Sequence, residues 1–592
     1  MCGIAGEVCF TGNADVAAVE RMAAVLAPRG PEGCGTYAQD GVALAHRRLK
    51  IIDLSASGGQ PMVDPQLGLA IVFNGCIYNY RELRADLERE GYRFFSHSDT
   101  EVLLKAYDRW GEAFVEHLHG MFALAIVERD SGDVVLVRDR LGIKPLYIAP
   151  TRSGVRFAST LPALLAAGGV DTTIDAVALH HYLSFHSVVP APRTLLAGVR
   201  RVEPGTLVRV CATRRTTIAT RYWQASFARD PAHDGMTPQD WSAAVLEALR
   251  TAVQRRMVAD VPVGVLLSGG LDSSLIVGVL AQAGQAHLST FSIGFEGAGE
   301  HDGDEFEYSD LVARHFATEH RRFLVSSDRL LPALGRAIAA MSEPMMSHDV
   351  VAFHLLSEEV SKYVTVVQSG QGADEIFAGY DWYPPLRDAA GDGLDAYASR
   401  FFDRGDAEIK EAVESDLAVY HDASREYAAA RFATDGADEP LDRALRLDTE
   451  VMLVDDPVKR VDNMTMAWGL EARVPFLDHE LVELAAACPP ELKLVQGGKG
   501  VLKDAARRVV PSEVIDRPKG SFPVPALIHL EGPFLEFVRE ALLSPEARAR
   551  GVFRREYVDR LLAAPNDERT PLGSSKLWQL GVLELWLQAH DM

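Results

Sequence analysis

A short apolar segment that runs into a glycine-rich loop constrains the fold of this chain more than any other feature. Residues 263–267 are apolar without polar alternation, which predicts a strand buried on both faces. Ser268-Gly269-Gly270 interrupts the segment, and Asp272 to Ser274 open an apolar helical run. A strand, a glycine-rich turn and a helix N-terminus bring backbone N–H groups and a positive helix dipole together. The segment therefore predicts an α/β domain with an anion site, which is not a Walker A loop because no Gly-Lys-Ser/Thr follows.

The loop has the form SGGxDS and resembles the pyrophosphate loop of ATP-pyrophosphatases, which cleave ATP into AMP and pyrophosphate. The resemblance implies that ATP binds here. Together with a second loop described below, it assigns ATP binding to Leu266, Ser268, Gly269, Gly270, Asp272, Ser273, Ser274, Ile293, Ser369 and Gly370. The alternative is an ordinary glycine-rich turn, which would not need two flanking hydroxyls and an acid.

The composition is that of a globular protein with more than one domain. The chain has 592 residues, of which 47% are hydrophobic and 24% charged. Its net charge of −23 argues against nucleic acids and anionic membranes as partners. The six cysteines lack CxxC or zinc-type spacing, and no apolar run approaches the ~20 residues of a membrane span. We therefore expect a cytoplasmic protein with reduced cysteines.

A cysteine directly after the initiator methionine offers a nucleophile with its own base. Removal of Met1 before Cys2 would leave a free α-amine, whose reference pKa is about 7.7–8.0. Such an amine can take the thiol proton of its own residue near neutral pH. The alternative is a cysteine that only begins a first strand, expected from Ile4 to Phe10.

Several motifs downstream of Cys2 follow one another in a specific order. They are RGPEG at 29–33, HRRLKIID at 46–53, QPM at 60–62, FNGCIYN at 73–79, SDTE at 98–101, GMFA at 120–123 and RDRLGIKPLY at 138–147. In order and spacing they resemble the glutaminase domain of class II glutamine amidotransferases, over about residues 2–200. The resemblance implies an α+β N-terminal-nucleophile fold of two packed antiparallel sheets between helices.

The same resemblance implies roles for individual residues. Cys2 would attack the glutamine side-chain amide, and the Asn74 side chain and Gly75 N–H would form the oxyanion hole. Arg48 would bind the α-carboxylate and Asp99 the α-ammonium. The full set of glutamine-binding residues would be Arg48, Ile51, Ile52, Asn74, Gly75 and Asp99. Each residue also has a structural alternative. Arg48 could be a surface arginine, Asn74-Gly75 a hairpin turn, and Asp99 a helix N-cap.

Cys76 departs from the glutaminase pattern. Members of that family often carry an acidic residue at this position, whereas this chain has a thiol. One contact to the glutamine ammonium would therefore be missing, and Asp99 would hold that charge without it.

The second half of the chain alternates short apolar strands with helices, which predicts a doubly wound parallel sheet. A buried strand at residues 364–367 ends in a second glycine-rich loop, QSGQGADE at 368–375. Loops at the carboxyl ends of such strands share one crevice, where Asp272 and Asp374 would hold Mg²⁺ on pyrophosphate oxygens. The alternative is that Asp374 only caps the next helix. We expect a glutaminase domain at 1–205, a hairpin and linker at 206–240, and an ATP-pyrophosphatase domain at 241–592.

Together with the two loops, the stretch at 455–478 resembles the synthetase domain of the asparagine synthetase family, over about residues 215–590. Lys519 lies where that family has a lysine close to the acyl-adenylate, and a surface lysine is the alternative. The two resemblances imply a glutamine-hydrolysing carbon–nitrogen ligase that uses ATP and Mg²⁺. Ammonia released at Cys2 would pass through a closed passage and attack an acyl-adenylate formed from an acceptor carboxylate.

The acceptor leaves alternatives open. Asparagine synthetases usually have a glutamate where this chain has Gln371, and a neutral amide cannot pair with an ammonium. The stretches 185–193, 304–310 and 455–464 look closer to N-acetylglutaminylglutamine amidotransferase, a bacterial relative that amidates an acetylated dipeptide. Such an acceptor has no α-ammonium, so we predict it ahead of aspartate, with Gln371 and Glu375 at the acceptor.

A non-catalytic protein that keeps the fold is a further interpretation, against which the intact set of predicted catalytic residues argues. The sequence does not decide between a monomer and a homodimer.

Overall fold

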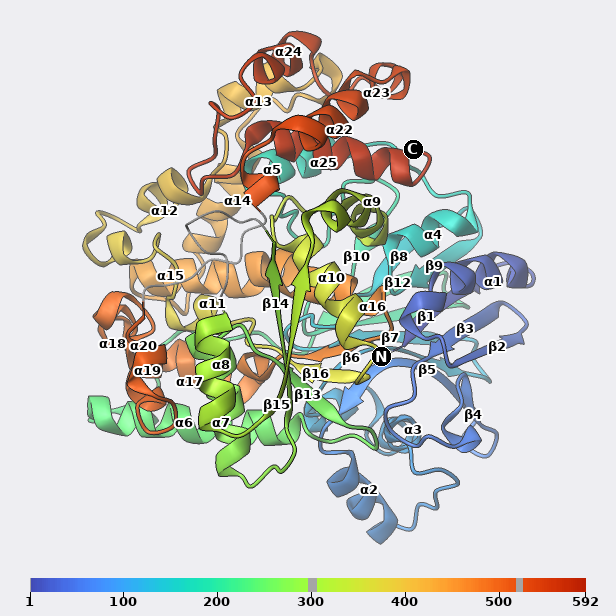
Figure 1. Ribbon diagram of the computed structural model, residues 1–592. Helices are drawn as coiled ribbons and strands as arrows, with labels where there is room; N and C mark the ends of the chain where they lie inside the picture. The colour runs from blue at the N-terminus through green and yellow to red at the C-terminus, as the bar shows by residue number, and fades with distance from the viewer. Residues whose placement is uncertain (1, 297–305, 518–524) are drawn as a thin grey trace.

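Two antiparallel sheets form the amino-terminal part of the molecule (Figure 1). The computed structural model describes residues 2–296, 306–517 and 525–592. The first sheet has the strand order β10 (Arg200–Arg201), β8 (Tyr147–Pro150), β9 (Gly154–Ala158), β1 (Gly3–Cys9), β3 (Val42–Arg48), β2 (Gly33–Gln39). The second has the order β12 (Thr216–Arg221), β11 (Thr206–Cys211), β7 (Val134–Arg138), β6 (Gly120–Glu128), β5 (Leu69–Ile77), β4 (Met62–Asp64).

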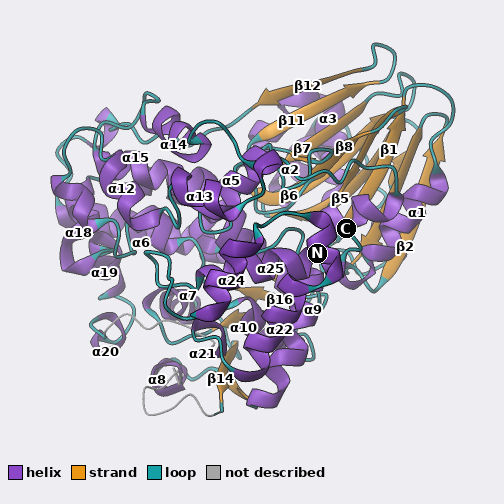
Figure 2. Cartoon of the chain, turned by 90° about the horizontal axis from the view of Figure 1, so that it is seen from above, coloured by secondary structure: helices purple, strands orange, loops and turns teal. Residues whose placement is uncertain are grey.

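The two sheets pack face to face, because alternate residues of each strand point toward the other sheet. The core between them includes Ile4, Val8 and Leu44 from the first sheet and Val72, Leu136 and Val210 from the second. On the outside, α1 (Val16–Val25) and α4 (Leu161–Ala167) contact the first sheet, and α3 (Asp99–Trp110) contacts the second. Figure 2 shows these strands gathered on one side of the molecule. The predicted fold of two antiparallel sheets between helices is confirmed.

A five-stranded parallel sheet organises the carboxyl-terminal part. Its order is β15 (Glu319–Val325), β14 (Ser289–Phe295), β13 (Val263–Leu266), β16 (Val366–Gln368), β17 (Glu471–Arg473). Every neighbouring pair is parallel. Since β13 and β16 are neighbours, the two predicted loops leave the same edge of the sheet side by side. The predicted parallel α/β sheet is confirmed.

Helices cover both faces of this sheet. Val265 packs in one hydrophobic cluster with residues of α6 (Pro238–Arg255), α7 (Leu271–Gln282) and α19 (Gly500–Ala506). The next residue, Leu266, packs in another with residues of α9 (Leu330–Ala340), α10 (Val350–Val360) and α16 (Lys459–Met466). Burial on both faces explains why these strands lack polar alternation.

The other α-helices surround these layers. They are α2 (Tyr80–Arg89), α5 (Ala176–Ser184), α8 (Phe306–His315), α11 (Ala373–Phe377), α12 (Leu394–Phe401), α13 (Asp406–Ala412), α14 (Ala423–Phe432), α15 (Pro440–Leu447), α17 (His479–Ala487), α18 (Pro490–Leu494), α20 (Ser512–Ile515), α21 (Pro525–Ile528), α22 (Gly532–Leu543), α23 (Pro545–Arg550), α24 (Arg555–Ala563) and α25 (Lys576–Ala589). Throughout the described ranges, no helix has both the length and the apolar character needed to traverse a bilayer.

The predicted hairpin is present as β11 and β12, which extend the second antiparallel sheet beyond β7.

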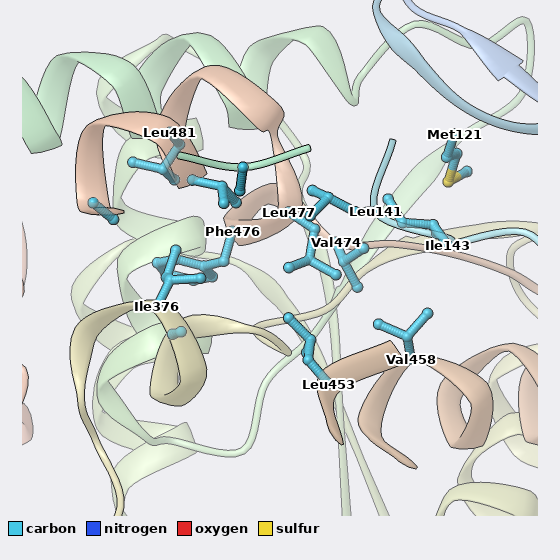
Figure 3. Packing of buried hydrophobic residues seen from close by; sticks show 14 of the residues in the cluster. Met121, Leu141, Ile143, Ile376, Leu453, Val458, Val474, Phe476, Leu477 and Leu481 are labelled. Atoms are coloured by element: carbon cyan, nitrogen blue, oxygen red, sulfur yellow. The ribbon is translucent and has the colours of Figure 1, made fainter. Parts of the chain in front are cut away.

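The two parts of the molecule meet across an apolar contact. At the contact, one hydrophobic cluster joins residues of both parts (Figure 3): Met121, Leu141 and Ile143 with Val458, Val474 and Leu477. The cluster is buried, so the contact between the two parts contributes to the core of the molecule.

Candidate active sites

Cys2 lies just before β1, beside the far end of β5. Its N–H donates to Oδ1 of Asn74 at 3.1 Å, and its thiol donates to the carbonyl oxygen of Leu49 at 3.9 Å. Burial raises the pKa of the Cys2 thiol, so the thiol needs a base to become a nucleophile. Among the described residues, none accepts a hydrogen bond from the buried Nδ2 of Asn74. A free donor beside a buried thiol is what an oxyanion hole requires.

The residues predicted to bind glutamine surround this thiol. A cavity beside Cys2 is lined by Arg48, Ile51, Ile52, Gly75 and Asp99. Asn74 joins the group through its hydrogen bond to Cys2. The structure therefore brings together residues that are up to 97 positions apart, all from the predicted set.

Backbone groups hold the two most specific of these residues in place. The Arg48 guanidinium donates to the carbonyl oxygen of Ser55 at 2.8 Å and also to that of Asp53, and the residue lines the cavity. A side chain at Gly75 would come within 2.2 Å of the carbonyl oxygen of Met121. Only glycine fits between β5 and β6 at that point.

Asp99 lies in the first turn of α3 and is not its N-cap, since the Ser98 side chain accepts the capping hydrogen bond from Thr100. Its Oδ2 accepts from the N–H of Ile77 at 3.1 Å. Burial, together with the nearby charge of Glu471, raises the pKa of the Asp99 carboxyl to about 7. The carboxylate is therefore easily protonated until a cation arrives.

A larger cavity, of about 580 Å³, opens at the carboxyl ends of the parallel strands. It is lined by most residues that the sequence assigns to ATP, to the metal and to the acceptor: Leu266, Ser268, Gly270, Asp272, Ser273, Ile293, Ser369, Gly370, Gln371, Asp374 and Glu375. Gly269 and Ser274 belong to the first loop but are not among the lining residues, and Ser274 is fully buried within α7. The two glycine-rich loops therefore face one site, as predicted from the sheet topology.

Close backbone packing explains the glycines of the first loop. Gly269 has a φ of +76°, and a side chain there would come within 2.6 Å of the N–H of Ser309. Gly270 is the N-cap of α7, so the first N–H groups of that helix lie at the cavity. This geometry suits the phosphate groups of a nucleotide.

Lys499 joins the two predicted metal ligands. Its Nζ lies 2.7 Å from Oδ2 of Asp272 and 2.9 Å from Oδ2 of Asp374. Burial opposes the charged form, but the two carboxylates together raise the pKa of Lys499 above its usual value. The two acids thus already share one cation, and their oxygen atoms form a donor set that fits Mg²⁺.

Lys499 is not among the residues predicted from the sequence, although the sequence contains a signal for it. It follows Gly497-Gly498 and precedes α19, so it repeats the pattern of a glycine-rich turn before a helix. Lys499 itself has a φ of +56°, which a lysine rarely adopts. Such strain is found preferentially at functional sites.

A buried acid lies on the wall near the second loop. The Tyr380 hydroxyl donates to Oε1 of Glu375 at 2.7 Å. Burial and the neighbouring charge of Asp374 raise the pKa of the Glu375 carboxyl to about 7. Arg460 lines the same cavity and pairs with Asp349 at 3.0 Å. Lys519, predicted to act here, lies outside the described residues.

Comparisons with known proteins match both halves of the chain. A family model described as asparagine synthase matches residues 244–588, and one described as glutamine amidotransferase domain matches residues 1–223. The chain belongs to the asparagine synthase family. It is a glutamine-dependent carbon–nitrogen ligase of the asparagine synthetase type.

Individual relatives of this family align over nearly the whole chain. Asparagine synthetase [glutamine-hydrolyzing] 1 of Bacillus subtilis (strain 168) is 32% identical, over 99% of this chain and 96% of its own. Asparagine synthetase B [glutamine-hydrolyzing] of Escherichia coli (strain K12) is 27% identical, over 88% and 82%. Amidase chry2 of Gibberella zeae is 26% identical, over 91% and 91%. Since these names differ, membership of the asparagine synthase family alone does not identify the acceptor.

Proposed function

We propose that the cavity at Cys2 hydrolyses glutamine. Cys2 would attack the side-chain amide with its own α-amine as base once Met1 is removed. Nδ2 of Asn74 and the N–H of Gly75 would stabilise the oxyanion, and the free hydrogen-bonding capacity of Asn74 supports this role. Arg48 would bind the α-carboxylate, Asp99 the α-ammonium, and Ile51 and Ile52 would pack on the side chain.

We infer that the larger cavity binds ATP and forms an acyl-adenylate. Supporting this, the loops at residues 268–270 and 369–371 face it together with the N-terminus of α7. Asp272 and Asp374 would hold Mg²⁺, which would offset charge on the pyrophosphate oxygens. Lys499 would then donate to phosphate oxygens, and Lys519 would neutralise charge near the reacting carboxyl.

Ammonia must travel between the two sites without meeting bulk water, because a protonated ammonium is not a nucleophile. The buried apolar contact of residues such as Met121, Ile143 and Val474 supports a protected route (Figure 3). The proposed domain limits, 1–205 and 241–592 with a linker between, put the two half-reactions on opposite sides of this contact.

For the acceptor, we propose a peptide-like carboxylate without a free α-amine, of the N-acetylglutaminylglutamine type. The observation that carries the proposal is Gln371, a neutral side chain on the cavity wall. An amide can donate or accept a hydrogen bond from an acetamide group, whereas it leaves a buried ammonium without a counter-charge. Glu375 would contact the same acceptor through its buried carboxyl.

Aspartate is the second candidate acceptor. Two observations favour it: relatives with asparagine synthetase names align over most of the chain, and Glu375 offers a carboxyl that could pair with an ammonium. Burial and the charge of Asp374 raise the pKa of this carboxyl, and a substrate ammonium beside it would favour its ionised form.

Pyrophosphate release separates the two candidates. Purified protein with ATP, Mg²⁺ and ammonia should release pyrophosphate with N-acetylglutaminylglutamine and much less with aspartate. Efficient asparagine formation without a response to the dipeptide would reject the first candidate and establish the second.

A further inference from the structure

One wall of the glutaminase cavity comes from the other domain. Glu471 is the first residue of β17, the edge strand of the parallel sheet, yet it lines the cavity that contains Cys2, Arg48 and Asp99. Its side chain is completely buried. A carboxylate from the synthetase sheet therefore faces the site where the proposed function places glutamine.

The partner of Glu471 connects it to the position where this chain departs from the glutaminase pattern. Nε of Arg473 donates to Oε1 of Glu471 at 2.6 Å, and Nη2 of Arg473 lies 3.6 Å from the sulfur of Cys76. Nη1 of the same arginine donates to the carbonyl oxygens of Arg256 and Val258 at 2.8 and 2.7 Å. Cys76 is buried, and burial raises its pKa, so it supplies no charge.

The charge on the bound glutamine requires compensation. Its α-carboxylate has the Arg48 guanidinium, but its α-ammonium meets a neutral thiol at position 76 and one aspartate. Burial raises the pKa of Asp99, whereas Arg473, acting against burial, lowers the pKa of Glu471 below its usual value. Near neutral pH, Glu471 is therefore the carboxylate with the fixed charge in this cavity.

Resting on the glutaminase role proposed above, we propose that Glu471 is a specificity residue that recognises the α-ammonium of glutamine together with Asp99. Glu471 supplies, from the opposite domain, the carboxylate that members of the glutaminase family often have at the position of Cys76. The glutamine site is then complete only when the synthetase sheet is docked against the glutaminase sheets.

The position of Glu471 also connects the two sites. Two residues further on, the carbonyl oxygen of Arg473 accepts from the N–H of Ser369, in the second nucleotide loop, at 2.8 Å. The loop before β13 adds a second tie, since the N–H of Asp260 donates to the carbonyl oxygen of Ile51 at 2.8 Å. A shift of the second nucleotide loop would therefore displace β17, and with it the Glu471 carboxylate that contacts the glutamine ammonium.

The test compares glutamine with 4-carbamoylbutanoate, which is glutamine without its α-amino group. Glu471→Gln should lower the ratio of kcat/KM for glutamine to that for the analogue by at least about tenfold, because the lost contact is a charged one. Cys76→Glu, combined with Glu471→Gln, should restore the ratio by returning a carboxylate beside Arg473. The matched control is Glu343→Gln, which removes another buried carboxylate at the domain contact, one that accepts from Tyr147 and lies outside this cavity.

Three outcomes would overturn the inference. They are an unchanged ratio in Glu471→Gln, an equal loss with both substrates, and an equal change of ratio in Glu343→Gln. If Glu471→Gln does not fold, Glu471→Asp is the second variant, because it keeps a carboxylate for Arg473 but shortens the side chain. It should still lower the ratio, and an unchanged ratio in Glu471→Asp would reject the role. Absence of glutamine hydrolysis in the unaltered protein would instead reject the glutaminase assignment itself.

Discussion

The two cavities of this protein handle charge in opposite ways. The one at Cys2 is small, and apart from Arg48 and the ion-paired Glu471 its polar lining is uncharged or easily neutralised: a thiol with a raised pKa, an amide, and an aspartate whose pKa is raised to about 7. The one at the parallel sheet measures about 580 Å³ and contains a salt-bridge network in which Lys499 pairs with both Asp272 and Asp374.

The difference follows from the substrates proposed for each site. A glutamine side chain is neutral, and its hydrolysis needs a thiol that becomes reactive only when the substrate is bound. ATP carries several negative charges, so its site must supply positive charge. In the proposed site, Mg²⁺ would take the place of Lys499 between the two acids when ATP binds. Five predictions test this contrast, beginning with the largest expected effect.

Replacing the nucleophile should separate the sites completely. In Cys2→Ala, glutamine-dependent amide synthesis should fall by at least about 10³-fold, while ammonia-dependent synthesis continues. Both rates are measured by amide formation. Cys9→Ala is the matched control, since Cys9 is the last residue of β1, the strand that follows Cys2, and its thiol donates to the carbonyl oxygen of Thr11. Loss of both activities in Cys2→Ala would show that the two sites are not independent.

Removing one carboxylate from the larger cavity should have the converse effect. In Asp272→Asn and in Asp374→Asn, AMP formation should fall by roughly 10²–10³-fold, because the charge that attracts Mg²⁺ is reduced. Glutamine hydrolysis by the same preparations serves as the control and should persist. Full ATP cleavage in either variant would mean that the metal binds elsewhere.

Removing the cation between these acids should reduce stability. Lys499→Met leaves two partly buried carboxylates facing each other and should lower the free energy of unfolding by about 2 kcal/mol, less than for a fully buried pair. Mg²⁺ should then raise the melting temperature of Lys499→Met more than that of the unaltered protein, since it can take the place of the ammonium. An equal response of both proteins to Mg²⁺ would contradict the shared site.

The acceptor end of the larger cavity should respond to charge more mildly. Gln371→Glu should slow amidation of the acetylated dipeptide by roughly tenfold, because it places a carboxylate near the acceptor carboxylate. The rate with aspartate should fall less or rise. If the dipeptide rate is unchanged, Gln371 does not contact the acceptor.

The smallest effect concerns pH. The Asp99 carboxyl, with a pKa of about 7, is mostly neutral below that pH and charged above it. The KM for glutamine should therefore decrease about threefold to tenfold as pH rises from about 6 to about 8. The KM for 4-carbamoylbutanoate, which has no ammonium, is the control. The same pH dependence for both substrates would assign the titration to another group.

The sequence alone determined the fold class of both domains and predicted most of the residues that the structure brings together around the two cavities. It could do so because each depends on local order along the chain. Residues 263–274 encode a strand, a turn and a helix start within 12 positions, and Cys2 and Asn74-Gly75 occur within short motifs. The edge at which the loops meet also followed from sequence, since parallel strands place their carboxyl ends together.

Only the tertiary structure decided how residues from distant segments share charge. Lys499 joins Asp272 and Asp374, which lie 227 and 125 positions before it, and Glu471 enters the cavity at Cys2 from the neighbouring domain. Neither fact is local, because an ion pair depends on which side chains the folded layers bring within a few ångströms. Burial acts in the same way: it raises the pKa of Asp99 and Glu375, and no composition or spacing along a chain reveals how deeply a carboxyl is buried.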